Sequence, residues 1–87
     1  MTRAEIVDVL LQYLKETNPV AQAHGPIPLD RPLHEVGILD SYGVIEMVAF
    51  IEQRFSIRIL DSEITLERFG GINKMSTLIE DKLAGRC

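Results

Sequence analysis

A long connection rich in proline and glycine, residues 18 to 40, constrains the fold of this chain more than any other segment. It holds all four prolines of the sequence and begins with Asn18-Pro19. Proline disfavours helix in the residue before it, so a helix that precedes this segment should end there. Connections of this length without their own secondary structure are uncommon in compact domains, and they often carry function. Spaced apolar residues predict that it lies against the core, with room for a turn of helix around residues 31 to 36: Leu29, Leu33, Val36 and Leu39.

Apolar residues at helical spacing predict a helix on each side of this connection. The first helix begins with a capping box, Thr2 with Glu5, and ends at Asn18-Pro19. The second helix should begin at Asp40 or Ser41 and run to about residue 55. Its expected apolar stripe comprises Ile45, Val48, Ile51 and Phe55, widened by Met47 and Phe50.

The C-terminal third of the chain predicts one short and one longer helix. Residues 56 to 60 alternate like a strand but have no partner strand, so we expect an extended connector. Asp61 or Ser62 should cap a short helix that carries Ile64, Leu66 and Phe69, and Gly70-Gly71 then breaks the chain. The apolar face of the last helix comprises Ile72, Met75, Leu78, Ile79 and Leu83, and Gly85 closes it. We therefore expect a single all-α domain over residues 1–87, an antiparallel four-helix bundle of three longer helices and one short helix, with the long loop between the first two.

Composition narrows the classes of function. A domain of 87 residues buries too little to hide a deep active site, and no acid–base or nucleophile pair can be assembled, so an enzyme is disfavoured. A net charge of −4 argues against nucleic acid, which requires clustered Lys and Arg, and favours partners with basic patches. The first residues do not resemble a signal peptide, and no apolar run is long enough to span a bilayer. We expect a cytoplasmic protein and a monomer.

Ser41 is the strongest candidate for a covalent modification site, because its hydroxyl lies where the second helix should begin. A helix N-terminus carries unpaired N–H groups and a partial positive charge, so it would stabilise a phosphodiester on Ser41 by roughly 0.3–1 kcal/mol. The loop before it should leave the hydroxyl exposed, and Gly43 keeps side-chain bulk away from it. The alternative is that Asp40 and Ser41 are ordinary N-cap residues, which capping statistics alone favour.

The whole arrangement resembles the acyl carrier and peptidyl carrier proteins along residues 3 to 84. The segment Gly37-Ile38-Leu39-Asp40-Ser41-Tyr42-Gly43 is most similar to stand-alone carriers such as D-alanyl carrier proteins. The resemblance implies that a magnesium-dependent phosphopantetheinyl transferase moves 4′-phosphopantetheine from coenzyme A to Ser41, and that Asp40 helps to engage this enzyme. It also implies an acyl- or aminoacyl-loading ligase or synthase, which charges the terminal thiol as a thioester.

Two departures from the best-known carriers point to a specialised protein. Carriers of fatty acid synthesis usually follow the serine with Leu and an acidic residue, whereas Tyr42 and Gly43 follow it here. Peptidyl carriers usually have a Gly-Gly-x-Ser-type loop, which this chain lacks. We therefore expect a free-standing carrier in specialised acyl transfer, lipid assembly or secondary-metabolite biosynthesis, with the cargo left open.

The resemblance makes residues just after Ser41 candidate docking contacts for partner enzymes. These candidates are Tyr42, Val44, Ile45, Glu46 and Ala49. Ile45 fits the core as well as it fits docking, and Glu46 fits a solvated helix position. The competing hypothesis is an unmodified helical interaction module, in which the same apolar patch binds a partner helix and Ser41 only caps its own helix.

The histidines and the cysteine suggest no further site. His24 and His34 lie in the loop without a cluster at metal-ligand spacing, so we expect surface histidines and no metal. Cys87 is the single cysteine, which excludes a disulfide within the chain, and we expect an unreactive terminal thiol.

Overall fold

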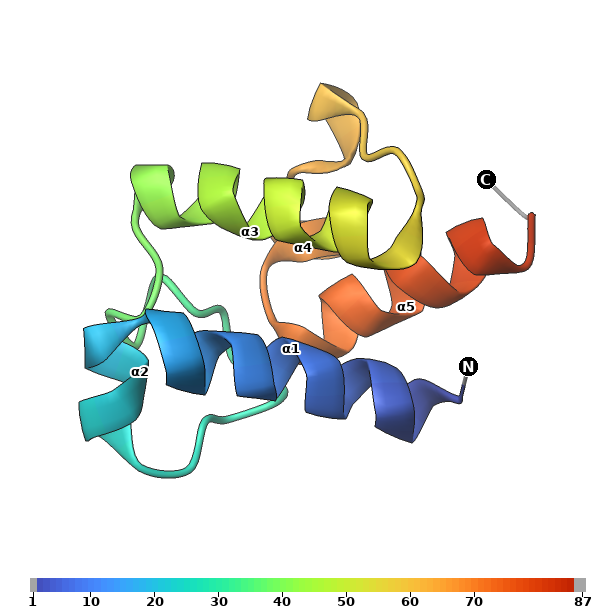
Figure 1. The fold of residues 1–87 in the computed structure, drawn as a ribbon. Coiled ribbons are helices and arrows are strands. Elements are labelled where there is room, and N and C mark those ends of the chain that lie inside the picture. The colour runs from blue at the N-terminus through green and yellow to red at the C-terminus, as the bar shows by residue number, and fades with distance from the viewer. Residues whose placement is uncertain (1, 86–87) are drawn as a thin grey trace.

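Every regular element in the computed structural model, which describes residues 2–85, is a helix. These elements are α1 (Arg3–Thr17), α2 (Pro19–His24), α3 (Ser41–Phe55), the 3-10 turn η1 (Asp61–Glu63), α4 (Leu66–Phe69) and α5 (Ile72–Leu83). Figure 1 shows α1 and α3 running in opposite directions, with α5 beside the N-terminal half of α1. The prediction of an all-α helical bundle with a long loop before the second long helix is confirmed.

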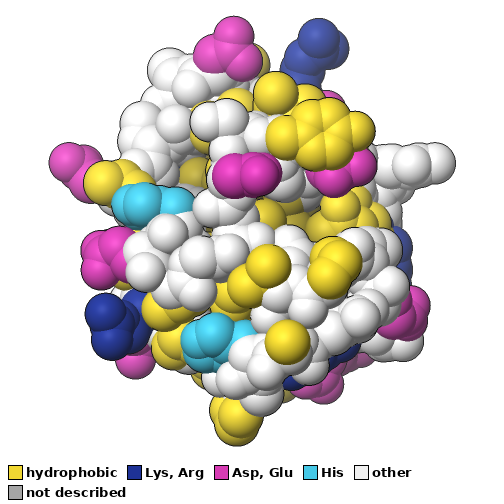
Figure 2. All heavy atoms as spheres, turned by 90° about the vertical axis from the view of Figure 1, so that its left-hand side faces the viewer, with side chains coloured by type: hydrophobic (Ala, Val, Ile, Leu, Met, Phe, Trp, Pro, Cys, Tyr) yellow, Lys and Arg dark blue, Asp and Glu magenta, His cyan; other side chains and the backbone are white. Residues whose placement is uncertain are grey.

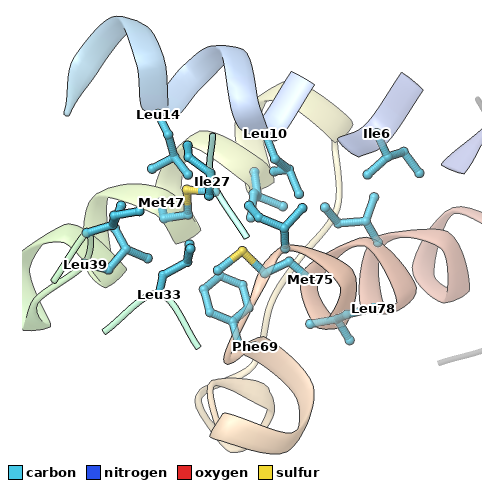
Figure 3. Close-up of a cluster of buried hydrophobic side chains, with 14 of the residues drawn as sticks. Ile6, Leu10, Leu14, Ile27, Leu33, Leu39, Met47, Phe69, Met75 and Leu78 are labelled. Carbon is cyan, nitrogen blue, oxygen red and sulfur yellow. The ribbon is translucent and has the colours of Figure 1, made fainter. Parts of the chain in front are cut away.

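One hydrophobic core joins the three long helices and the loop (Figure 3). Ile6, Leu10 and Leu14 of α1 point toward Met47 of α3 and Met75 of α5. The loop between α2 and α3 contributes four buried apolar residues, Ile27, Leu33, Ile38 and Leu39, and α2 contributes Ala21. The prediction that the loop lies against the core is confirmed for Leu33 and Leu39, whereas Val36 is half-buried and Leu29 is exposed.

The prediction that residues 18 to 40 hold no helix beyond a single turn was wrong, because α2 begins at Pro19. Proline is well suited to the first helical position, where its missing N–H would have no partner. The Asn18 side chain accepts a hydrogen bond from the Ala21 N–H at 3.0 Å and caps the new helix. α1 still ends at Thr17, as predicted, and a hydrogen-bonded turn at residues 33 to 37 takes the place of the turn of helix.

The segment after α3 differs from its prediction in two respects. Neither Asp61 nor Ser62 caps a helix, because η1 begins after Leu60 and has no side-chain cap bond. Residues 57 to 60 form the expected extended connector, but the short helix is split into η1 and α4. Ile64 leaves the helical region with φ −87° and ψ 71°, and the Thr65 hydroxyl then accepts the Arg68 N–H at 3.2 Å. A Thr side chain competes well as an N-cap, so α4 starts afresh after Thr65.

Leu66 and Leu83 are more exposed than predicted, and the exposure of Ile45, for which core and docking were both open, places it on the surface. Ile45, Leu66 and Leu83 are 67%, 61% and 44% exposed. Leu83 lies in the last turn of α5, just before the turn in which Gly85 takes φ 75°. The prediction that Gly85 closes this helix is confirmed, and Cys87 lies outside the described residues.

A nearly buried ion pair fixes η1 to the end of α5. The Glu63 carboxylate accepts the Leu60 N–H at 2.8 Å and pairs with Lys82 Nζ at 2.8 Å. The two side chains are only 8% and 12% exposed. The hydrogen bond from Lys82, followed by that from Leu60, lowers the pKa of Glu63 below its usual range despite burial.

Candidate functional site

Ser41 is the first residue of α3, and its side chain is exposed at one end of the bundle. In Figure 1 this is the end where α3 begins, close to α2. The predicted start of the second helix at Asp40 or Ser41 is confirmed. Another protein can therefore reach the Ser41 hydroxyl, whereas it could not reach a buried hydroxyl.

Asp40 is the N-cap of this helix. Its carboxylate accepts the Gly43 N–H at 2.7 Å, and its carbonyl accepts the Val44 N–H at 2.9 Å. The first four N–H groups of a helix have no intrahelical acceptor. The Asp40 carboxylate satisfies the Gly43 N–H, and the N–H groups of Ser41 and Tyr42, at the first two helical positions, are among the donors that the helix end offers to an anion.

Gly43 leaves space for the residues that lead into the helix. A Cβ placed on it would stand 3.0 Å from Leu39 Cδ2 and 3.3 Å from Asp40 Oδ1. Leu39 is buried, so the first turn of α3 rests directly on the core. The absence of a side chain at residue 43 thus serves close packing beneath the helix start.

Four of the five candidate docking residues share one exposed stripe of α3. Tyr42 and Ile45 are 68% and 67% exposed, and Glu46 and Ala49 are also exposed. Positions 42, 45, 46 and 49 follow the i, i+3, i+4, i+7 spacing of a helix face. Figure 2 views the end of the molecule that carries α2 and the start of α3, where hydrophobic and acidic side chains are interleaved and Lys and Arg lie toward the edges.

Val44, the fifth candidate, lies on a different stripe. It is half-buried and lines a half-open cavity of about 200 Å³ between the loop, α3 and α4. The wall of this cavity is mostly apolar, formed by Leu33, Leu39, Val44, Ile64, Leu66 and Phe69. His34 and Thr65 are its polar members. The cavity therefore offers an apolar surface beside the helix start.

The histidines do not come together in a cluster. His24 ends α2 and His34 lies in the turn, and both are exposed. Within residues 2–85, no three His, Cys, Asp or Glu side chains are placed to hold a metal ion. None of the helices described is long and apolar enough to cross a membrane.

Sequence reasoning missed one residue that shapes the site, Asn18. Besides capping α2, its side-chain amide donates to the Ile38 carbonyl at 2.7 Å. Asn18-Pro19 pointed only to the end of a helix, although Asn before Pro also fits the N-cap and first positions of a new one. The bond to Ile38 joins residues twenty apart, and no local pattern predicts it.

Comparison with known proteins gives a consistent set of relatives. The chain is 36% identical over 74 residues to a D-alanyl carrier protein of Streptococcus gordonii, covering 84% of each chain. A D-alanyl carrier protein of Streptococcus thermophilus matches with the same identity and coverage, and that of Streptococcus sanguinis is 26% identical over 74 residues. No protein-family model matches the chain.

Proposed function

This chain belongs to the family of acyl and peptidyl carrier proteins, and we propose that it holds an acyl or aminoacyl group as a thioester on a 4′-phosphopantetheine arm attached to Ser41. The protein itself catalyses no reaction in this proposal. It presents the cargo to partner enzymes. The exposed Ser41 hydroxyl at the start of α3 is the observation that carries the proposal.

The surroundings of Ser41 fit a phosphodiester. In the proposed modification, the Ser41 oxygen forms a bond to the phosphorus of coenzyme A that bears the pantetheine. The bond from that phosphorus to the oxygen bridging the two phosphates breaks, adenosine 3′,5′-bisphosphate leaves, and the hydroxyl proton passes to a base of the transferase. The free N–H groups at the helix start then face the new phosphate, while Asp40 holds the first turn in place.

The arm, once attached, supplies a thiol that keeps the carbonyl of the cargo activated and lets it reach several active sites. The exposed stripe of Tyr42, Ile45, Glu46 and Ala49 is proposed as the docking face for the transferase and for a loading ligase or synthase. The apolar cavity beside Val44 is proposed to shelter the end of the arm or its cargo. The names of the relatives favour an aminoacyl group such as D-alanine, within a specialised acyl-transfer, lipid or secondary-metabolite pathway.

Intact-mass spectrometry tests the proposal directly. Wild-type protein incubated with coenzyme A, Mg²⁺ and a broad-specificity phosphopantetheinyl transferase should gain one phosphopantetheine. Ser41→Ala should gain none and remain helical. Ser62→Ala is the matched control, because Ser62 is an exposed serine near the start of another helical turn, and this variant should be modified at the wild-type rate.

Two results would reject the assignment. An adduct on Ser41→Ala would place the attachment elsewhere. A wild-type chain that stays unmodified would favour the unmodified interaction module, in which the same exposed stripe binds a partner helix. Mass spectrometry of the protein taken from its own cells, with the thioester preserved, would then identify the cargo.

A further inference from the structure

The junction between α1 and α2 lies against the segment that leads into Ser41. Asn18 is the single residue between the two helices, and all its polar groups are engaged. Its N–H donates to the Leu14 carbonyl at 2.9 Å, and its own carbonyl accepts the Gln22 N–H at 3.0 Å. Its side-chain oxygen caps α2, and its side-chain amide donates to the Ile38 carbonyl. Asn18 is thus fixed by both helices and reaches across to the loop.

Ile38 is held from two sides. Its N–H donates to the Leu33 carbonyl at 2.9 Å, while its carbonyl accepts from Asn18 Nδ2 at 2.7 Å. Ile38 and Leu39 are buried, and Asp40 and Ser41 follow immediately. The last residues of a long loop are therefore anchored two positions before the cap that starts α3. Such anchoring lets an exposed serine keep a defined position.

Asn18 also lies at the candidate site itself. Asn18, Ile38, Asp40 and Tyr42 line one surface hollow of about 260 Å³ beside the start of α3. Val20, 48% exposed on α2, lines the same hollow. A partner that approaches Ser41 therefore meets the α1–α2 junction together with the first turn of α3.

We propose that Asn18 is a positioning residue for modification of Ser41, because its side-chain amide locks the Ile38 carbonyl and so fixes the entrance to α3. This inference rests on the proposed function. Without the lock, the segment from Ile38 to Ser41 samples several conformations, and the transferase binds only the fraction in which Ser41 is presented. The apparent affinity of the transferase for this chain then falls by that fraction, while the rate at saturation is kept.

Asn18→Asp removes the hydrogen bond to the Ile38 carbonyl and keeps the capping of α2. The carboxylate still accepts the Ala21 N–H, and Asp caps helices as well as Asn does. It cannot donate to the Ile38 carbonyl, and its charge repels that oxygen. With the transferase, KM for Asn18→Asp should rise about tenfold with kcat nearly unchanged, as expected for a partly buried carbonyl that loses its partner.

Lys15→Met is the matched control, because the hydrogen bonds of Lys15 hold α2 and the residue after it and do not involve residues 38 to 41. Its ammonium donates to the carbonyls of Ala21 and Gly25. This variant should loosen α2 and keep the wild-type KM. If Lys15→Met raises KM as much as Asn18→Asp does, general loosening of α2 explains the effect and the positioning role is refuted.

A second measurement does not depend on the transferase. Backbone NMR order parameters for residues 38 to 41 should fall in Asn18→Asp and stay at the wild-type level in Lys15→Met. A folded Asn18→Asp with wild-type KM and wild-type order parameters would overturn the inference. Should Asn18→Asp not fold, Asn18→Ser keeps a cap acceptor but is too short to reach Ile38, and it takes the same test. A wild-type chain that accepts no phosphopantetheine would reject the proposed function. The order parameters would still show whether the Asn18 side chain holds residues 38 to 41 in place.

Discussion

The carboxylate of Asp40 accepts the backbone N–H of Gly43 at 2.7 Å, so the residue before the candidate serine is also the cap of the helix that the serine begins. The observed role of Asp40 as a cap and its proposed role in recognition by the transferase therefore involve the same side chain. Loss of modification in an alanine variant would not tell them apart. The two roles separate if the charge is removed and the acceptor is kept.

Asp40→Asn should retain the stability of the fold and slow modification of Ser41. Asn and Asp cap helices about equally, whereas Asp40→Ala should lower the free energy of unfolding by about 1 kcal/mol. Urea denaturation gives the stabilities, and the rate of phosphopantetheine transfer gives recognition. If Asp40→Asn is modified as fast as wild type, Asp40 acts only as a cap, and its proposed contact with the transferase is wrong.

The ion pair of Glu63 with Lys82 should make part of the stability depend on pH. The pKa of Glu63 is lowered in the folded state, so its contribution is complete above the ordinary value of 4.5 and is lost as the pH falls through the lower folded pKa. At neutral pH, Glu63→Gln should cost about 2 kcal/mol, since Lys82 is left nearly buried without its counter-charge. Urea denaturation from pH 7 to pH 3 should show this difference shrinking on acidification.

Other groups that titrate in that range cancel in the comparison of Glu63→Gln with wild type. Glu5, whose pKa is lowered chiefly by its hydrogen bond with the Thr2 backbone, is present in both proteins. Glu67→Gln, on the exposed surface of α4, is the control and should leave the stability nearly unchanged at all pH values. A difference between Glu63→Gln and wild type that stays constant down to pH 3 would contradict the ion-pair account.

Gly71→Ala should destabilise the fold because of a backbone contact. A Cβ on Gly71 would stand 2.7 Å from the Arg31 carbonyl oxygen, where the loop lies against the start of α5. The loop is held there by a hydrogen bond from the Asn73 N–H to the Leu29 carbonyl at 3.0 Å. We expect the free energy of unfolding to fall by about 1–3 kcal/mol, measured by urea denaturation.

Gly37 provides the contrasting case. No atom lies within 4 Å of a Cβ on Gly37, but its φ of +78° is a left-handed conformation. Asn tolerates this region far better than Ala, so Gly37→Asn should be more stable than Gly37→Ala. At Gly71 the obstacle is space, and Asn there should be no better than Ala. Equal stability of Gly71→Ala and wild type would show that the loop yields at Arg31.

The parts of this fold that the sequence predicted are those with local causes. The capping box of Thr2 and the N-cap Asp40 act within one helical turn, so the starts of α1 and α3 could be placed closely. The split between η1 and α4 was missed, because the predicted cap at Asp61 or Ser62 does not form and the Thr65 side chain caps α4 instead. The contact of Asn18 with Ile38 depends on how the loop folds back, which periodicity does not encode.

The outer face of α3 shows a second limit of periodicity. Ile45 fits an i, i+3 series with Val48 and Ile51, yet it is 67% exposed, whereas Met47 is fully buried. The inner stripe keeps Ile51 but has Val44 and Met47 in place of Ile45 and Val48. An apolar stripe two residues wide can be centred on either series, and only packing against α1 and the loop decides between them.

Ile45 and Met47 should therefore respond in opposite ways to truncation. Ile45→Ala should change the free energy of unfolding by less than about 0.5 kcal/mol, because an exposed side chain loses few contacts. Met47→Ala should cost about 2–5 kcal/mol, because it opens a cavity in the core. Because Ile45 belongs to the proposed docking face, the folded Ile45→Ala variant should also bind the transferase or the loading enzyme less tightly. This should appear as a higher KM of that enzyme for the variant. If Ile45→Ala is stable and both enzymes act on it with the wild-type KM, Ile45 is not part of the docking face. If its free energy of unfolding falls by several kcal/mol, Ile45 packs in the core.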